Sequence, residues 1–394
     1  MIKQEQLYWS KEDENRKERW AHLTLNEEAK LKVRDDNKRR KLEVLLDNTA
    51  RWLIEKGVCK LEGNRIIVES TTTTDIGAFT TMAFPLVRRI WPELIANELV
   101  SVQPISQPTA KVFYLDFIRG SAGTPSSTYP SGQTLHDHFD SDYADTTEGG
   151  EVKEVNFRVS SVDVSAHQKK LKAKWTIEAQ QDLLAYHGLD AEAEVMKILA
   201  LEITREIDYE IINNLLTAAT QPANSEGGEG AGNVNWSSTA PSTSPWNVLN
   251  PKEYQETLYD AILDANNLIF KKVYRNATWI IANPDTCAIL EKLNDFKLDK
   301  NSAENRFNIG VHRFGTIKNR FLVYKHPDFI ANKILVGFNG NSWLETGFVY
   351  APYIPLYTTP LLIDADDFTP RRGILSRYAT KVINAGCYAT VTIV

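Results

Sequence analysis

The sequence is poor in cysteine and lacks the short motifs on which many enzyme classes depend. Its three cysteines, Cys59, Cys287 and Cys387, lie far apart, so they predict no disulfide framework or CxxC metal site and suit a reducing compartment. We find no apolar run of about eighteen residues and no basic-then-apolar start, and therefore expect neither a membrane span nor a secretion signal. The GxxxxGK[ST], GxGxxG, HExxH and GxSxG motifs are also absent.

A strong charge of either sign is missing as well. The net charge is −6 over 394 residues, which gives no electrostatic footprint of a dedicated nucleic-acid binder. With 42% hydrophobic residues, the chain is long enough for two or three packed lobes.

Residues 189–219 predict one long helix, around which the rest of the chain is organised. Asp190 is a suitable N-cap, and Glu192 and Glu194 favour the positive end of the helix dipole. Apolar residues recur at three- and four-residue steps and form one stripe, and others widen it, so more than one face should be covered. The helix is either an ordinary core helix or a brace that spans a domain. The stripe contains Met196, Leu199, Ile203, Ile207, Ile211 and Leu215, widened by Val195, Ile198, Leu201 and Ile212.

The first 69 residues differ from the remainder because charges of both signs alternate along them. This pattern predicts one or two exposed helices that pack weakly or against a partner. The segment is either a solvated charged surface or a removable, partner-docking piece. The polar, β-branched residues 71–82 that follow favour an extended arm.

Two extended segments flank a polar tip in the next part of the chain. Residues 111–119 and 152–164 predict strands, and the glycine-rich, acidic residues 120–150 between them predict a protruding loop. Together they predict a long two-stranded arm. A second low-complexity loop is expected at residues 220–246.

From residue 250 the alternation of helical and strand patterns predicts a mixed α/β lobe. Its expected elements are a helix at 251–273, a strand at 278–284, a helix at 284–296 and further strands at 321–327 and 333–339. The chain ends in two alternating strands around Asn384. These pair as a hairpin, or both join a sheet shared with earlier elements.

Two polar groups are candidates for chemistry. His136, Asp137 and His138 are potential metal ligands, but their loop offers no scaffold to fix the geometry, so we favour a solvated loop tip. Glu178 and Asp182 are four residues apart and share a helix face. Paired carboxylates can perform acid–base work, yet no nucleophile accompanies them, and we favour pairing at a surface or interface. We therefore predict no catalytic, cofactor-binding or metal-binding residue.

An arm, a protruding loop and a long apolar helix suit a lattice better than a monomer. Such features expose strand edges and apolar stripes that need covering. In a lattice, each subunit reaches onto its neighbours.

Three blocks of the sequence resemble the major capsid proteins of T-even-type tailed phages. They are PLVRRIWPELIANELVSVQPISQPTAKVFYLDF, AKWTIEAQQDLLAYHGLDAEAEVMKILALEITREIDYEII and APYIPLYTTPLLIDADDFTPRRGILSRYATKVIN. The strings YIPLYTTP and AYHGLDAEAE are specific. The resemblance implies the α+β Hong Kong 97 capsid fold, with an N-terminal arm, an extended loop, a peripheral domain with a spine helix, and an axial domain.

The resemblance also implies a division of the chain. Residues 1–69 would be a charged helical segment, a candidate scaffold-like propeptide, and residues 70–119 the N-terminal arm and entry to the peripheral domain. The remaining parts would be the extended loop (120–170), the peripheral domain (171–249, with spine helix 189–219), the axial domain (250–350) and C-terminal strands that return to the sheets (351–394). The short loop leaves no room for the inserted domain that some family members carry.

A cleavage site is implied as well. A prohead protease of the family cuts after Leu/Ile-x-Glu, and Ile67-Val68-Glu69 fits this signature, so the candidate cut lies between Glu69 and Ser70. The same residues are also consistent with a plain strand start.

The function implied is that of a structural protein without catalysis or cofactor, which forms hexamers and pentamers of an icosahedral or elongated head around double-stranded DNA, bound without sequence specificity. Expected partners are scaffold, portal, vertex and prohead protease proteins, with no membrane, and assembly would occur in the host cytoplasm. Candidate inter-subunit contacts are His136, Asp137, His138, Glu178, Asp182 and Arg119. The alternatives are a cellular encapsulin-like nanocompartment shell and a metal-dependent hydrolase using His136 and His138.

Overall fold

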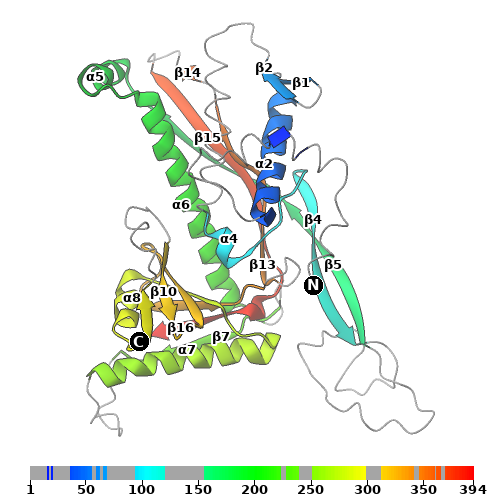
Figure 1. The fold of residues 1–394 in the computed structure, drawn as a ribbon, viewed down its shortest axis with the longest axis vertical. Helices are drawn as coiled ribbons and strands as arrows, with labels where there is room; N and C mark the ends of the chain where they lie inside the picture. Colours follow the sequence, from blue (N-terminus) through cyan, green and yellow to red (C-terminus); the bar gives the residue numbers. More distant parts are fainter. Residues whose placement is uncertain are drawn as a thin grey trace, which may run out of the picture.

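The computed structural model describes residues 16, 19–20, 36–55, 59–62, 65–68, 94–119, 155–222, 228–238, 251–298, 312–340, 346–359, 361–364 and 369–394. One long helix, α6 (Ala191–Ala219), runs from the end of the molecule that carries α5 to the lobe that carries α7 (Figure 1). A five-stranded sheet accompanies its length, and a seven-stranded sheet lies at its C-terminal end. The α+β class is confirmed.

The predicted long helix is confirmed, and its ends follow from local chemistry. The Asp190 side chain caps the helix by accepting a hydrogen bond from the Glu192 N–H at 3.1 Å. Gly188, with a φ of 64°, ends the preceding helix, so α6 begins at Ala191. The six stripe residues named above and Ile212 are buried. The prediction that Ile198 and Leu201 widen the buried apolar stripe is wrong, because both side chains are exposed.

The five-stranded sheet is covered by a helix on each face. It contains β3 (Ser101–Val102), β6 (His167–Lys174), β13 (Phe348–Thr358), β14 (Leu362–Ile363) and β15 (Pro370–Val382). On one face, the Tyr378 hydroxyl of β15 donates to Glu210 of α6 at 2.7 Å. On the other, the rings of Tyr357 in β13 and Trp52 in helix α2 (Asp36–Glu55) are 3.9 Å apart.

Weak packing of the charged N-terminal segment is a wrong prediction for α2. Leu42, Leu45 and Leu46 are fully buried, because they recur at helical spacing on one side of an otherwise charged helix. The Asn48 amide donates to the carbonyls of Ile105 and Tyr353 at 2.9 and 3.0 Å. This helix therefore belongs to the core of the subunit.

A short antiparallel hairpin follows α2. Its strands are β1 (Cys59–Glu62) and β2 (Arg65–Val68). The plain strand noted as one interpretation of this stretch is therefore present. The candidate cleavage residues Glu69 and Ser70 lie outside the described residues.

The predicted two-stranded arm is confirmed where the chain is described. After the short helix α4 (Ala96–Leu99), β4 (Thr109–Arg119) pairs along its whole length with β5 (Val155–Ser165) in antiparallel register. Val112 and Val164 at its base pack against Val349 and Ala379 of the five-stranded sheet. The arm projects from this anchor (Figure 1).

The α/β lobe is also confirmed. Its sheet has the order β7-β16-β12-β8-β11-β10-β9, and helices α7 (Pro251–Val273) and α8 (Pro284–Glu291) accompany it. Leu258, Ile262 and Ile269 of α7 are fully buried in this lobe's own core. The strands are β7 (Gly232–Trp236), β8 (Trp279–Ala282), β9 (Phe296–Leu298), β10 (His312–Ile317), β11 (Phe321–Lys325), β12 (Lys333–Gly337) and β16 (Tyr388–Ile393).

Two expectations about this lobe need correction. The loop predicted at 220–246 contains β7, which pairs in parallel with β16; Trp236 anchors it, since its ring is buried and its N–H donates to Thr257 at 2.8 Å. The C-terminal strands form no hairpin. A 3-10 turn, Ala385–Cys387, separates β15 in one sheet from β16 in the other.

Candidate functional site

Exposed apolar side chains concentrate at the end of the molecule where α6 begins. Helix α5 (Ile177–His187) and strand β14 lie at this end (Figure 1). The backbone N–H of Trp175, just before α5, donates to Pro370 of β15 at 3.1 Å, and Pro370 pairs with β14. We call the exposed apolar residues here the distal apolar surface: Ile177, Leu184, Tyr186, Leu189, Leu361, Leu362 and Ile363.

Helix α5 is well formed although it has no buried residue. Thr176 caps its start by accepting a hydrogen bond from the Ala179 N–H at 3.2 Å, and Gly188 ends it in the left-handed conformation. The side chains of Leu184 and Tyr186 are nevertheless 61% and 82% exposed. Local capping accounts for the helix, but packing within the subunit leaves its apolar residues uncovered.

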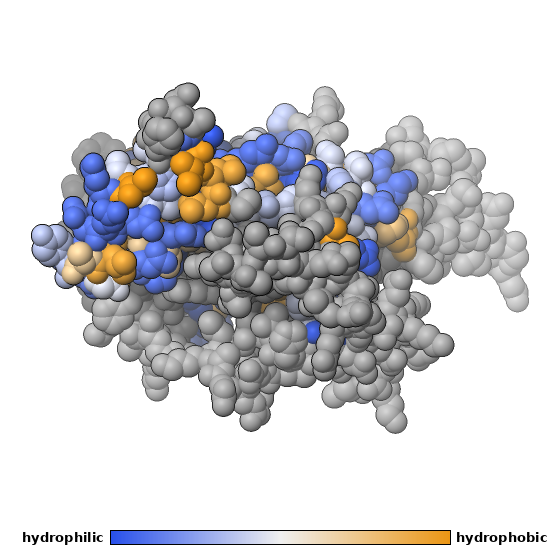
Figure 2. All heavy atoms as spheres, turned by 90° about the horizontal axis from the view of Figure 1, so that it is seen from above, coloured by the Kyte–Doolittle hydropathy of each residue, from blue (hydrophilic) through white to orange (hydrophobic). Residues whose placement is uncertain are grey.

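Figure 2 shows this end from above, with apolar residues in separate patches on a surface that is otherwise largely polar where it is described. Exposed apolar residues gathered at one end of a soluble protein are candidates for an interaction site. The predicted pair Glu178 and Asp182 is exposed on α5 within this region. Carboxylates around apolar residues resemble the polar rim of an interface.

The outer side of α6 carries a second exposed row. It contains Ile198, Leu201 and Tyr209. Between them, the Arg205 guanidinium contacts Asp328 of the lobe through Nε and Nη2, at 2.9 and 2.6 Å. This ion pair ties the helix to the lobe while leaving the apolar residues on either side accessible.

Of the remaining predicted contact residues, the structure describes Arg119. Arg119 is the last residue of β4 and its backbone pairs with Val155. His136, Asp137 and His138 lie outside the described residues. The structure therefore brings Glu178 and Asp182 together on one helix and places Arg119 at the end of β4.

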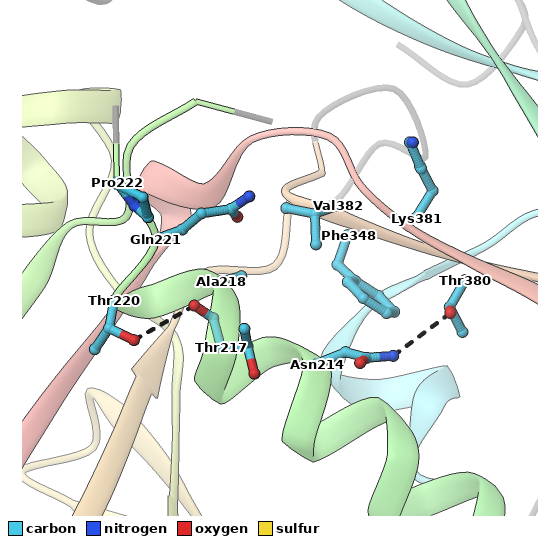
Figure 3. Close-up of a pocket in the computed structure, with 10 residues that line it drawn as sticks. All are labelled: Asn214, Thr217, Ala218, Thr220, Gln221, Pro222, Phe348, Thr380, Lys381 and Val382. Atoms are coloured by element: carbon cyan, nitrogen blue, oxygen red, sulfur yellow. Dashed lines mark hydrogen bonds between the residues drawn. The ribbon is translucent and has the colours of Figure 1, made fainter. Parts of the chain in front are cut away.

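A recess of ≈ 590 Å³ lies at the C-terminal end of α6 (Figure 3). Its wall contains a weak contact of 3.5 Å from the Asn214 amide to the Thr380 hydroxyl. The lining has no carboxylate, imidazole or thiol, and so offers no acid–base pair. The lining residues are Asn214, Thr217, Ala218, Thr220, Gln221, Pro222, Phe348, Thr380, Lys381 and Val382.

Chemistry elsewhere is equally limited in the described part of the chain. No group of three His, Cys, Asp or Glu side chains there could hold a metal ion. Burial raises the pKa of the Cys287 and Cys387 thiols to about 12, so both are unreactive at neutral pH. None of the described helices has the length and apolar character needed to cross a membrane.

Asp208, in the middle of α6, is a buried ionisable group with a strongly shifted pKa. Its carboxylate accepts a hydrogen bond from the Ile95 N–H at 3.2 Å. Burial raises its pKa to about 8, although this hydrogen bond acts in the opposite direction. Asp208 therefore joins α6 to the start of α4.

Comparison with known proteins agrees with this arrangement. The family model "Major capsid protein Gp23" matches residues 76–148 and 118–392. The major capsid protein of Vibrio phage KVP40 is 25% identical over 80% of this chain and 78% of its own length. That of Enterobacteria phage T4 is 25% identical over 58% and 45%. Among solved structures, the capsid protein of an empty GTA particle has 16% identity and a TM-score of 0.46, covering 76% of this chain and 89% of its own.

The protein is thus a structural component of a tailed-phage capsid, with the mixed helix-and-sheet architecture expected for a Hong Kong 97-type subunit. The chain belongs to the Gp23 family of major capsid proteins. This is a family of structural proteins and not of enzymes, and the cellular nanocompartment alternative is not favoured.

The sequence patterns missed the residues that dominate the distal apolar surface. In α5, Leu184 and Tyr186 are two residues apart and do not form a helical stripe. The one available signal was a helix of low amphipathicity directly before the long helix. Leu361–Ile363 followed a proline and gave no periodicity.

Proposed function

We propose that the chain assembles through the distal apolar surface into hexamers and pentamers of an icosahedral or elongated head, which encloses double-stranded DNA without catalysis. The observation that carries this proposal is α5, a capped helix that has no buried residue and that exposes Ile177, Leu184 and Tyr186. Such exposed area is costly in water and is stabilised by burial against another copy. Assembly would take place in the host cytoplasm.

The proposed contacts include the polar candidates. Glu178 and Asp182 would form the rim around the distal apolar surface, and Arg119, His136, Asp137 and His138 would reach a neighbour through the arm. Residues 71–82 would run along the outer row of a neighbouring α6. Scaffold, portal, vertex and protease proteins are the further partners that we propose.

The division of the chain given above is retained as part of this proposal. The peripheral domain would centre on α6 and the five-stranded sheet, and the axial domain on the seven-stranded sheet. Residues 1–69 would be the segment removed by a cut between Glu69 and Ser70. Since α2 is buried, release of that segment would require its contacts with β13 to be broken.

The test is assembly of the full-length chain carrying Leu184→Ser and Tyr186→Ser, viewed by electron microscopy and measured by light scattering. We expect shells, tubes or hexameric rings from the unaltered protein and a loss of assembly of about tenfold or more in the variant, because two apolar anchors are lost. A matched control, Phe270→Ser with Leu298→Ser, alters exposed apolar residues of the other lobe. Equal assembly of variant and unaltered protein would refute the proposal.

Mass spectrometry of native particles tests the cleavage separately. Chains that begin at Ser70, in particles that contain DNA, would support it. Chains with an intact Glu69–Ser70 bond would contradict it.

A further inference from the structure

Strand β6 carries an exposed lysine at every second position: Lys170, Lys172 and Lys174. Alternate residues of a strand share one face of the sheet. The intervening residues Leu171 and Ala173 pack against the core. These anchors fix the orientation of the strand, so the lysines, which we call the lysine strip, lie together on the face away from α6.

The anchoring extends to a neighbouring lysine that faces the other way. Lys169 contacts Glu206 and Glu210 of α6 at 3.3 and 2.8 Å. These ion pairs involve partly exposed side chains and contribute modestly to stability. Their main effect is on the orientation of β6, because they hold one face of the strand toward α6 and the lysine strip on the opposite face.

The lysine strip lies at an edge of the sheet, next to a further basic residue. Among the described strands, β6 pairs only with β15 and so forms an edge of the sheet. Arg371 is the direct partner of Lys174 and adds a further positive group, although it also contacts Asp364 at 2.8 Å. Gly373 is opposite Lys172, and its N–H donates to the Thr359 hydroxyl at 2.8 Å, so Thr359 packs beside the strip at this position.

The opposite charge is gathered on α5 and α6. These helices carry many carboxylates and few basic residues, so charge is segregated within a chain whose net charge is −6. Their acidic residues are Glu178, Asp182, Glu192, Glu194, Glu202, Glu206, Asp208 and Glu210, against Lys197 and Arg205 as the fully charged cations. The strip is therefore a local feature and not a consequence of overall composition.

We propose that the lysine strip binds the phosphate backbone of duplex DNA; this rests on the proposed function, in which the shell encloses DNA. Adjacent lysines of the strip are about 6.6 Å apart along the strand, close to two phosphate steps of about 3.4 Å along one DNA strand. Lysine is a flexible point charge suited to phosphate contacts that do not read sequence.

The main rival occupant is the acidic surface of α5 and α6 on a second copy. Lysine is depleted in protein–protein interfaces, whose centres favour apolar and aromatic residues. In this molecule those residues lie on the distal apolar surface and not on β6. The composition of the strip therefore favours a polyanion over another copy.

The experiment compares full-length protein with the triple variant Lys170→Gln, Lys172→Gln and Lys174→Gln. The probe is a fluorescein-labelled random-sequence duplex of about 30 base pairs, titrated by anisotropy between about 50 and 200 mM NaCl. A matched control, Lys197→Gln, Lys292→Gln and Lys297→Gln, removes the same charge from exposed lysines elsewhere. Thermal melting of each variant checks folding.

We expect the strip variant to flatten the plot of log K against log salt by about 2.7, since each phosphate contact contributes about 0.9. Its affinity at 50 mM NaCl should fall by about tenfold or more, with little change in the control. Equal loss in both variants would overturn the proposal in favour of diffuse charge. Unchanged DNA binding would overturn it too, and lost shell assembly with unchanged DNA binding would assign the strip to a second copy.

Electron microscopy of the same samples separates this inference from the proposed function. If the strip variant forms shells and keeps its DNA affinity, the proposal that the lysine strip binds DNA is contradicted, and the proposed function is not. Failure of the unaltered protein to form any shell contradicts the proposed function.

Discussion

The two ends of α6 differ in how completely the subunit covers them. Near its C-terminal end, every residue of β8 is buried: Ile280 and Ala282 lie in the core that contains α7, and Trp279 and Ile281 in the core that contains α6. Near its N-terminal end, α5 buries none of its residues. The first region buries its apolar side chains within the subunit, whereas the second exposes apolar surface whose burial needs another molecule. This contrast indicates that folding and assembly depend on separate sets of residues.

The largest effect on folding should come from the buried stripe of α6. Ile211 is a fully buried residue of α6. The substitution Ile211→Ala should therefore lower the free energy of unfolding by about 2–5 kcal/mol. Urea denaturation measures this change. A loss below about 1 kcal/mol would show that the stripe is less tightly packed than described.

Asp208 should make stability depend on pH in an unusual direction. Its folded pKa of about 8 lies above the ordinary 3.8, so the folded state binds the extra proton, and its contribution is lost as pH rises from about 4 to 8. We expect a loss of about 1 kcal/mol per pH unit in that window. Asp208→Asn should remove this dependence in urea denaturation at pH 5 and pH 8. Parallel pH profiles for both proteins would contradict it.

A smaller effect is expected where α2 meets the sheet. Asn48→Ala leaves the carbonyls of Ile105 and Tyr353 without the amide donor, which should cost about 1–3 kcal/mol of unfolding free energy. The control Lys38→Gln alters a residue near the start of the same helix. Equal free energies of unfolding for the two variants would show that α2 is not part of the subunit core.

The smallest effect on folding should come from the distal apolar surface. Tyr186→Ser should change the free energy of unfolding by less than about 0.5 kcal/mol, because the ring is largely exposed. Its effect should fall on assembly instead, as light scattering would measure. A large loss of stability in the isolated subunit would erase the distinction between the two ends.

The sequence predicted elements well where periodicity and caps agreed. Asp190 and the apolar steps along α6 located the helix, and alternation located the arm. Prediction from the sequence failed where tertiary contacts determine the structure of a segment. The burial of Leu42, Leu45 and Leu46 against the sheet was not predicted, because the surrounding segment is highly charged. Strand β7 was not predicted, because it lies in a glycine-rich stretch.

The candidate site was less predictable than the fold. Exposure of Ile198 or Tyr186 depends on what the rest of the subunit leaves uncovered, and no local pattern encodes that. The alternating lysines of β6 were visible in the sequence, but their common face became meaningful only once Leu171 and Ala173 were placed against the core.

The most direct test of the account is an electron cryomicroscopy reconstruction of the assembled particle. The side chain of Tyr186, 82% exposed in the single subunit, should be buried against another copy of the chain. A well-resolved shell in which Tyr186 and Leu184 still face solvent would contradict the central claim.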